Sequence, residues 1–182
     1  MKGFLKRFRR RFSYLFDRSL PSLEDYLAEL PDLDIARPAN ADEYAESLGL
    51  KLGVEIEVVR LGTEAHKDIE TQLGRAPQVA EMLYDAEAGR ALICIPSYVG
   101  EDDFLYFKSL YHELSHLAAG HPIPVADAPG ELWRPPERLA RKPPGANLIR
   151  NETEADLRAE WTLMFAIMGQ KIYDRERHFS TF

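Results

Sequence analysis

Residues 104–119, FLYFKSLYHELSHLAA, are the stretch of sequence that decides the fold. The preceding loop, residues 96–103, ends in acidic residues that suit a helix N-terminus, and Gly120 and Pro122 supply a stop. The pattern therefore predicts one long helix over 104–119. Apolar side chains dominate this stretch, so we expect the helix to be packed in the core and to carry its HELSH motif there.

The HELSH motif places His112 and His116 one helical turn apart on the same face. Both imidazoles can then reach one zinc ion at about 2.0–2.1 Å. Glu113 is offset from that direction, so it can act on a water at the metal instead of binding the metal. Chance is the alternative, but unpaired histidines are costly to bury in such an apolar helix. The motif predicts a zinc site of a peptidase, with Glu113 as the catalytic base.

A catalytic zinc site also needs a third protein ligand and one open position. A metzincin motif would place glycine and histidine at the positions that Ala119 and Pro122 occupy, whereas Gly120 and His121 are displaced by one residue. We therefore do not expect His121 to bind the metal. At the end of a helix, its side chain is expected to be satisfied by backbone groups or water.

Better candidates for the third ligand lie in residues 151–161, NETEADLRAEW. Glu152 and Asp156 share one helix face, so with Glu152 on zinc, Asp156 can accept a hydrogen bond from a zinc-bound histidine. Glu154 points about 160° away from Glu152 in an ideal helix and is the alternative ligand. The pattern favours Glu152 as the third ligand of the zinc.

The rest of the chain predicts further helices and a small sheet. Apolar runs at 54–61, 79–84 and 90–95 predict strands, and the last two flank a hairpin-like turn. We expect a small, mainly antiparallel sheet packed on the 104–119 helix, which gives an α+β domain. The flanking helices are predicted from their end signals and apolar content: a short one from Ser22 that Pro31 closes, one over 41–48 that Gly49 stops, and a buried one over about 148–173.

Two segments have unusual composition. Residues 121–146 contain seven prolines, so we expect an irregular, lid-like loop without packed secondary structure. Residues 1–18 carry seven Lys or Arg against one Asp and have helical apolar spacing. This predicts a basic amphipathic leader helix, which either docks on its own domain or contacts a membrane or a partner.

Composition limits the classes of protein to consider. The chain has 182 residues, 45% of them apolar, which suits one domain. The net charge is −7, and because residues 1–18 carry +6, residues 19–182 carry −13, which argues against nucleic acid binding by the body. A single cysteine, Cys94, and the absence of a signal peptide or an apolar span of membrane length favour a cytoplasmic protein.

These motifs together resemble the ImmA/IrrE-type zincins over roughly residues 40–170. That family pairs a HELxH helix with a later E-x-x-A-[ND]-x-x-A helix, matched here by Glu152, Ala155, Asp156 and Ala159. The run 43–59, EYAESLGLKLGVEIEVV, is similar to the family's entry helix and first strand. The resemblance implies a gluzincin-like domain over 19–182, zinc held by His112, His116 and Glu152, and site-specific cleavage of a regulatory protein, typically a transcriptional repressor.

A second resemblance covers residues 93–121, ICIPSYVGEDDFLYFKSLYHELSHLAAGH, which are similar to the zincin domain of ArdC-type antirestriction proteins. A short RLxR sequence follows in that family and is matched here by residues 138–141. The two families agree on metal chemistry but differ in biology. The ArdC likeness implies the alternative function, a binding or regulatory module with an antirestriction or interaction role and without peptidase activity.

Overall fold

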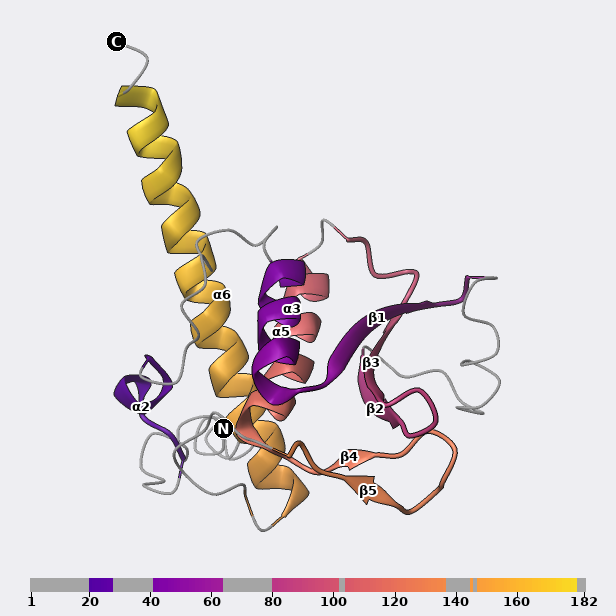
Figure 1. Cartoon of the computed structure of the whole chain (residues 1–182). Helices are drawn as coiled ribbons and strands as arrows, with labels where there is room; N and C mark the ends of the chain where they lie inside the picture. Colours follow the sequence, from indigo (N-terminus) through magenta and orange to yellow (C-terminus); the bar gives the residue numbers. More distant parts are fainter. Residues whose placement is uncertain are drawn as a thin grey trace, which may run out of the picture.

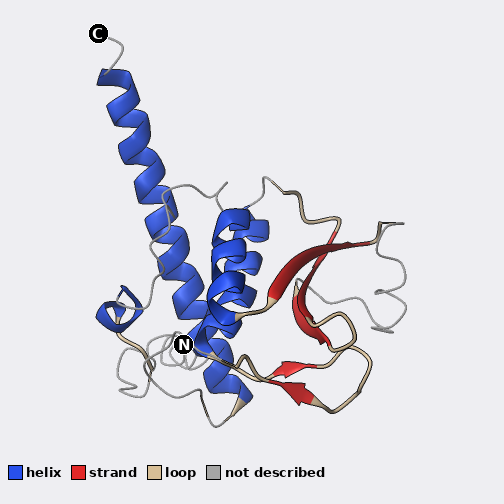
Figure 2. Ribbon diagram, in the orientation of Figure 1, coloured by secondary structure: helices blue, strands red, loops and turns tan. Residues whose placement is uncertain are grey.

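A computed structural model describes residues 20–27, 41–63, 80–101, 104–136, 145 and 147–179, with side chains as far as residue 166. The predicted leader helix over 1–18 lies outside these residues. The helices are α2 (Leu23–Leu27), α3 (Ala41–Leu52), α5 (Phe104–Ala119) and α6 (Leu148–Phe179), and the strands are β1 (Glu55–Leu61), β2 (Glu81–Asp85), β3 (Arg90–Pro96), β4 (Ile123–Pro124) and β5 (Leu132–Trp133). This mixture of helices and small sheets confirms the α+β class (Figure 2).

The main sheet has the order β1-β3-β2. β2 and β3 form the predicted antiparallel hairpin, whose turn ends at Gly89 with φ of 71°. β1, however, pairs with β3 in parallel, so the three-stranded sheet is mixed and only its hairpin is antiparallel. β3 takes the central position because its run ALICI is apolar on both faces, as a strand covered on both sides requires.

The core lies between the sheet and the helices that cover one of its faces (Figure 1). Ile93 and Ile95 of β3 face this core, where they join Leu110, Leu114 and Leu117 of α5. α5 therefore lies between the sheet and α6, with α3 beside it (Figures 1 and 2). The predicted burial is confirmed for the part of the helix that carries HELSH, because every residue from Ser109 to Ala119 except His112 is buried, whereas Phe104 and Leu105 at its start are exposed.

Helix α3 extends beyond its predicted end at Gly49. This glycine is helical and buried, and a Cβ atom there would lie 2.6 Å from the carbonyl oxygen of Val54. Gly49 thus permits a close approach of the chain, and the stop is supplied by Gly53, which has φ of 66°.

Residues 121–146 are less irregular than predicted. Within their described part, β4 and β5 pair antiparallel, with Ile123 opposite Trp133. The prediction of no packed secondary structure was wrong here because Ile123 is buried in the core and the Trp133 ring stacks on Tyr84 of β2 at a centroid distance of 4.0 Å. These apolar contacts stabilise a short hairpin despite the surrounding prolines.

Helix α6, predicted as a buried helix over about 148–173, is buried along one face and extends to Phe179. Ala155, Ala159 and Leu163 are buried against α5, whereas Met164 is 42% exposed. The C-terminal part of the helix runs well beyond the other elements (Figure 1). Among the described residues, no helix combines the length and the apolar character that crossing a membrane would require.

Candidate metal centre

The side chains of His112, His116 and Glu152 converge on one point between α5 and α6. The Nε2 atoms of the two histidines lie 3.1 Å apart, Oε2 of Glu152 lies 3.2 Å from Nε2 of His112, and Oε1 lies 3.6 Å from Nε2 of His116. Ligands about 2.0–2.1 Å from a tetrahedral zinc ion are separated by about 3.3 Å. The described residues thus contain a donor set whose chemistry and spacing fit zinc.

Two packed helices create this arrangement. α5 presents both histidines on the face that packs against α6, because they are one turn apart. α6 begins beside them, and Oδ1 of Asn147 accepts a hydrogen bond of 2.9 Å from the backbone N–H of Arg150 as an N-cap. Glu152 therefore lies in the second turn of α6, on the face that meets the two histidines.

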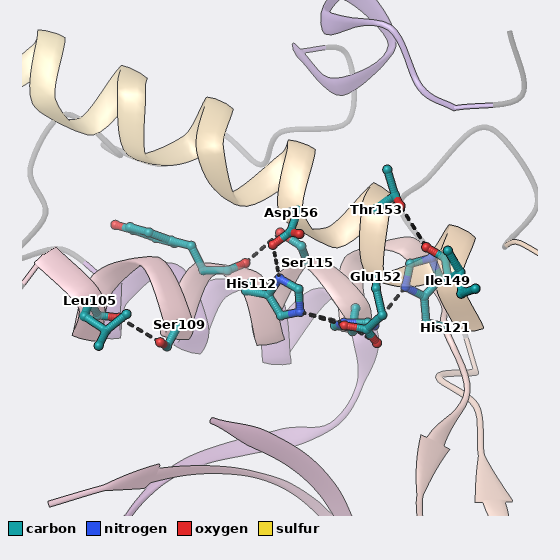
Figure 3. A network of polar contacts seen from close by, with 11 residues as sticks. Leu105, Ser109, His112, Ser115, His121, Ile149, Glu152, Thr153 and Asp156 are labelled. Carbon is teal, nitrogen blue, oxygen red and sulfur yellow. Dashed lines mark hydrogen bonds and ion pairs between the residues drawn. The ribbon is translucent and has the colours of Figure 1, made fainter. Parts of the chain in front are cut away.

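Asp156 follows Glu152 by one turn and contacts the same histidine. Its Oδ1 atom lies 3.0 Å from Nδ1 of His112, so the ring lies between the two acids of α6 (Figure 3). Burial alone would lower the pKa of His112, but the hydrogen bonds to Asp156 and Glu152 raise it to about 10. With Nδ1 directed to Asp156, Nε2 is the nitrogen left for a metal.

The electrostatics of the other two members also suit metal binding. Burial lowers the pKa of His116, which favours the neutral ring that a metal ligand needs. Hydrogen bonds from His112 and His116 lower the pKa of Glu152, which keeps its carboxylate charged. The proposed ligands therefore tend toward the protonation states that bind zinc, with His112 as the group that must lose a proton.

Glu113 is buried next to this group on α5, with 8% of its surface exposed. Burial is the main cause that raises its pKa, to about 7, and the positive charge of His112 opposes that rise. A carboxyl group with a pKa near neutrality can take up and release a proton at physiological pH. The position and the pKa both suit the predicted role of Glu113 as a general base.

The alternative ligand Glu154 lies outside this group of converging side chains. It is fully buried and points to the other side of α6, where Oε1 accepts a hydrogen bond of 3.1 Å from Nε of Arg158. Its Oε2 atom lies 3.5 Å from Nε2 of His121. Glu152 and Glu154 point apart because residues two positions apart in a helix face nearly opposite directions.

His121 also lies outside this group, and it contacts a side chain that the sequence did not suggest. Its Nδ1 atom lies 3.0 Å from Nδ1 of His116, on the side of that ring opposite to Nε2. We expected backbone groups or water to satisfy this side chain. Gly120, at the end of the helix, was the available signal, since a left-handed residue there turns the next one back over the helix.

A cleft of about 650 Å³ opens beside the three converging side chains. Its walls come from the start of α6, the β4–β5 hairpin and residues 80–82 of the edge strand β2 and its approach. The lining includes Glu113, His116 and Glu152 together with apolar groups such as Met82 and Ile123. A substrate in this cleft would reach both the candidate metal ligands and the candidate base.

Comparison with models of protein families, with curated proteins and with solved structures found no match to this chain. The function is therefore argued from the geometry and chemistry of the site.

Proposed function

We propose that this chain is a zinc-dependent endopeptidase. The observation that carries the proposal is the convergence of His112, His116 and Glu152 at tetrahedral ligand spacing, with the buried Glu113 in the same cleft. Two histidines and a glutamate with one open position are the ligand set of catalytic zinc in many peptidases. A structural zinc site would instead use four protein ligands, and the described group supplies three.

Zinc in this site would supply Lewis acidity, which lowers the pKa of a bound water and polarises a substrate carbonyl. Glu113 accepts a proton from the attacking water and then donates it to the departing amine, so no proton is gained or lost overall. Asp156 holds the His112 ring in the orientation that presents Nε2. His112, His116 and Glu152 would hold the zinc, and the cleft beside them would admit the substrate.

The cleft fits an extended segment of polypeptide. β2 is an edge strand of the main sheet, and residues 80–82 form one wall of the cleft beside Glu113. An extended peptide can add to such an edge through backbone hydrogen bonds, which places its carbonyl groups along the cleft. The apolar side chains of Met82, Ile123 and Leu132 would then contact the side chains of the substrate.

The resemblance to the ImmA/IrrE-type zincins supports a regulatory protein, such as a transcriptional repressor, as the substrate. It rests on the HELSH motif and on Glu152, Ala155, Asp156 and Ala159. The structure adds a physical reason for part of this pattern, since Ala155 and Ala159 are fully buried and allow α6 to pack closely against α5. Glu152 and Asp156, the polar residues of the same pattern, contact His112.

The test compares the wild type with Glu113→Gln, which keeps the size of the side chain but removes the base. We expect about one zinc per chain in both proteins, measured by elemental analysis, and loss of peptide cleavage in the variant by at least about 100-fold. The inactive variant should also retain its protein substrate in a pull-down. Cleavage that persists in Glu113→Gln would contradict the mechanism, and a protein that binds zinc but cleaves nothing would favour the alternative of a binding or regulatory module.

A further inference from the structure

We propose that His121 and Glu154 are positioning residues that fix the ring of His116 for metal binding, through a buried chain of polar contacts that ends at Arg158. This inference rests on the metal site proposed above. The chain runs from His116 at the end of α5, through His121, to Glu154 and Arg158 on α6. The contact with His121 uses Nδ1 of His116, the ring nitrogen opposite to the one that faces His112 and Glu152, and His121 also lines the cleft.

The backbone places His121 over His116. Gly120 has φ of 67°, its N–H donates to the carbonyl of Leu117, and the N–H of His121 donates to the carbonyl of His116, each at 3.0 Å. This pair of hydrogen bonds is the Schellman motif, which closes a helix with glycine in the left-handed conformation. The chain therefore reverses at Gly120, and the imidazole of His121 returns against the ring of His116.

The contacts determine which ring nitrogen of His116 and of His121 carries the hydrogen. A neutral imidazole has one N–H, so a His116 ring that binds a metal through Nε2 must carry its hydrogen on Nδ1. That N–H can donate to Nδ1 of His121, at 3.0 Å, when Nδ1 carries no hydrogen. The hydrogen of His121 is then on Nε2, which faces Oε2 of Glu154 at 3.5 Å.

Glu154 completes the chain as an anion. Its two oxygen atoms have different partners, since Oε1 binds Arg158 and Oε2 faces His121. The guanidinium of Arg158, 3.1 Å from Oε1, supports the charged form of Glu154. Nε2 of His121 and Oε2 of Glu154 are both buried, and among the described residues they have this 3.5 Å contact with each other and no closer hydrogen-bond partner.

Burial argues that these groups have a role beyond packing. The side chains of His121, Glu154 and Arg158 are 1%, 1% and 2% exposed. A buried ion pair such as that of Glu154 and Arg158 is often no more stabilising than apolar side chains of the same size. Its presence here therefore calls for another reason. The two zinc histidines would thus be oriented differently: His112 by the exposed Asp156, and His116 by a chain shielded from water.

Two substitutions of His121 separate positioning from packing. In His121→Asn, the amide oxygen takes the place of Nδ1 and can still accept from His116, but the side chain does not reach Glu154. In His121→Gln, the longer side chain reaches Glu154 but leaves Nδ1 of His116 without its acceptor. We expect zinc affinity, measured by competition with a chelating indicator, to fall about threefold in His121→Asn, which keeps the acceptor for His116 but loses Glu154. In His121→Gln, which loses the acceptor, we expect it to fall about 10- to 100-fold.

A spectroscopic measurement supports this comparison. Cobalt substituted for zinc reports the ligand geometry in its visible absorption. We expect the spectrum of His121→Asn to match the wild type and that of His121→Gln to change. Thermal unfolding of the chelator-treated proteins serves as the control, because a residue that only closes the helix would lower the stability of both variants and leave zinc affinity unchanged.

The outcomes distinguish this inference from the proposed function. Equal zinc affinity in the wild type and both folded variants, or an equal loss in both, would overturn the inference and leave the peptidase proposal intact. If His121→Gln does not fold, Glu154→Gln provides the second comparison, with a smaller loss of zinc affinity expected because the His116 contact remains. A wild type that binds no zinc would overturn both proposals.

Discussion

The Oδ1 atom of Asp156 lies 3.0 Å from Nδ1 of His112, while Glu152, one turn earlier on α6, lies 3.2 Å from Nε2 of the same ring. One helix thus contacts both nitrogens of a histidine on another helix. The two contacts raise the pKa of His112 to about 10 although burial opposes the rise. Asp156 therefore orients the ring for a metal. At the same time it raises the affinity of the ring for the proton that competes with the metal.

This double role predicts a pH-dependent effect of Asp156→Asn. A proton must leave His112 before Nε2 binds zinc, and below the pKa the deprotonated fraction rises tenfold per pH unit. Near pH 9 we expect the variant to bind zinc about 10-fold more weakly, because the orienting carboxylate is lost. Near pH 6 the deficit should shrink, because the variant no longer stabilises the proton. Zinc titrations at both values measure this, and a deficit that grows at low pH would contradict it.

Glu152→Gln tests the third ligand directly. The amide has nearly the same shape but lacks the charge, so we expect zinc affinity to fall by at least about 100-fold. Glu160→Gln is the matched control, since Glu160 is exposed on the same helix and should change affinity less than about twofold. Elemental analysis after dialysis against a chelator distinguishes the variants. Equal zinc retention in both would exclude Glu152 as a ligand.

The raised pKa of Glu113 predicts that the stability of the chelator-treated protein depends on pH. Its pKa is raised from 4.5 to about 7, mainly by burial, so the folded state binds more protons than the unfolded state between these values. Stability therefore falls as pH rises through this window and is lowest above it. We expect Glu113→Gln to be more stable than the wild type by on the order of 2 kcal/mol at pH 8, with the difference nearly gone at pH 4.

Urea denaturation at the two pH values measures this difference. Glu46→Gln is a suitable control, because Glu46 is exposed on α3 and should show little change at either pH. A difference between wild type and Glu113→Gln that stays constant with pH would show that the pKa of Glu113 is the same in the folded and unfolded states.

The local elements of the site could be predicted from sequence because their signals are contiguous. α5 begins and ends at the predicted residues, since apolar spacing and the glycine stop act within the segment itself. The one-turn spacing of His112 and His116 and that of Glu152 and Asp156 also follow from helix geometry. What the sequence left open was the choice between Glu152 and Glu154 and which of the two histidines Asp156 would contact.

The features that were missed depend on contacts between distant segments. The parallel pairing of β1 with β3 is decided by which strand occupies the centre, and that depends on both faces being covered. Gly49 looked like a helix stop, yet it serves the approach of Val54. Likewise, the contact of His121 with His116 requires the left-handed backbone of Gly120, and its partner Glu154 comes from another helix.

The stack of Trp133 on Tyr84 predicts that a substitution of Trp133 weakens substrate binding without changing zinc affinity. The rings are 4.0 Å apart and nearly parallel, at 3°, and they hold the β4–β5 hairpin against β2 at the wall of the cleft. A two-stranded hairpin this short is not stable alone, so the stack is expected to anchor it. In Trp133→Ala we expect KM for a peptide substrate to rise about 10-fold, a change of about 1.4 kcal/mol, with zinc affinity unchanged.

Trp133→Phe is the control for this prediction, because a smaller aromatic ring can still stack on Tyr84 and should keep KM within about threefold of the wild type. Steady-state kinetics on a cleavable peptide, together with zinc titration, give both readouts. A loss of zinc affinity in Trp133→Ala would mean that the hairpin supports the metal centre itself. Equal KM values for Trp133→Ala and Trp133→Phe would mean that aromatic stacking does not position this wall. A higher KM in Trp133→Ala alone would show that the hairpin contributes to substrate binding, while α5 and α6 hold the metal.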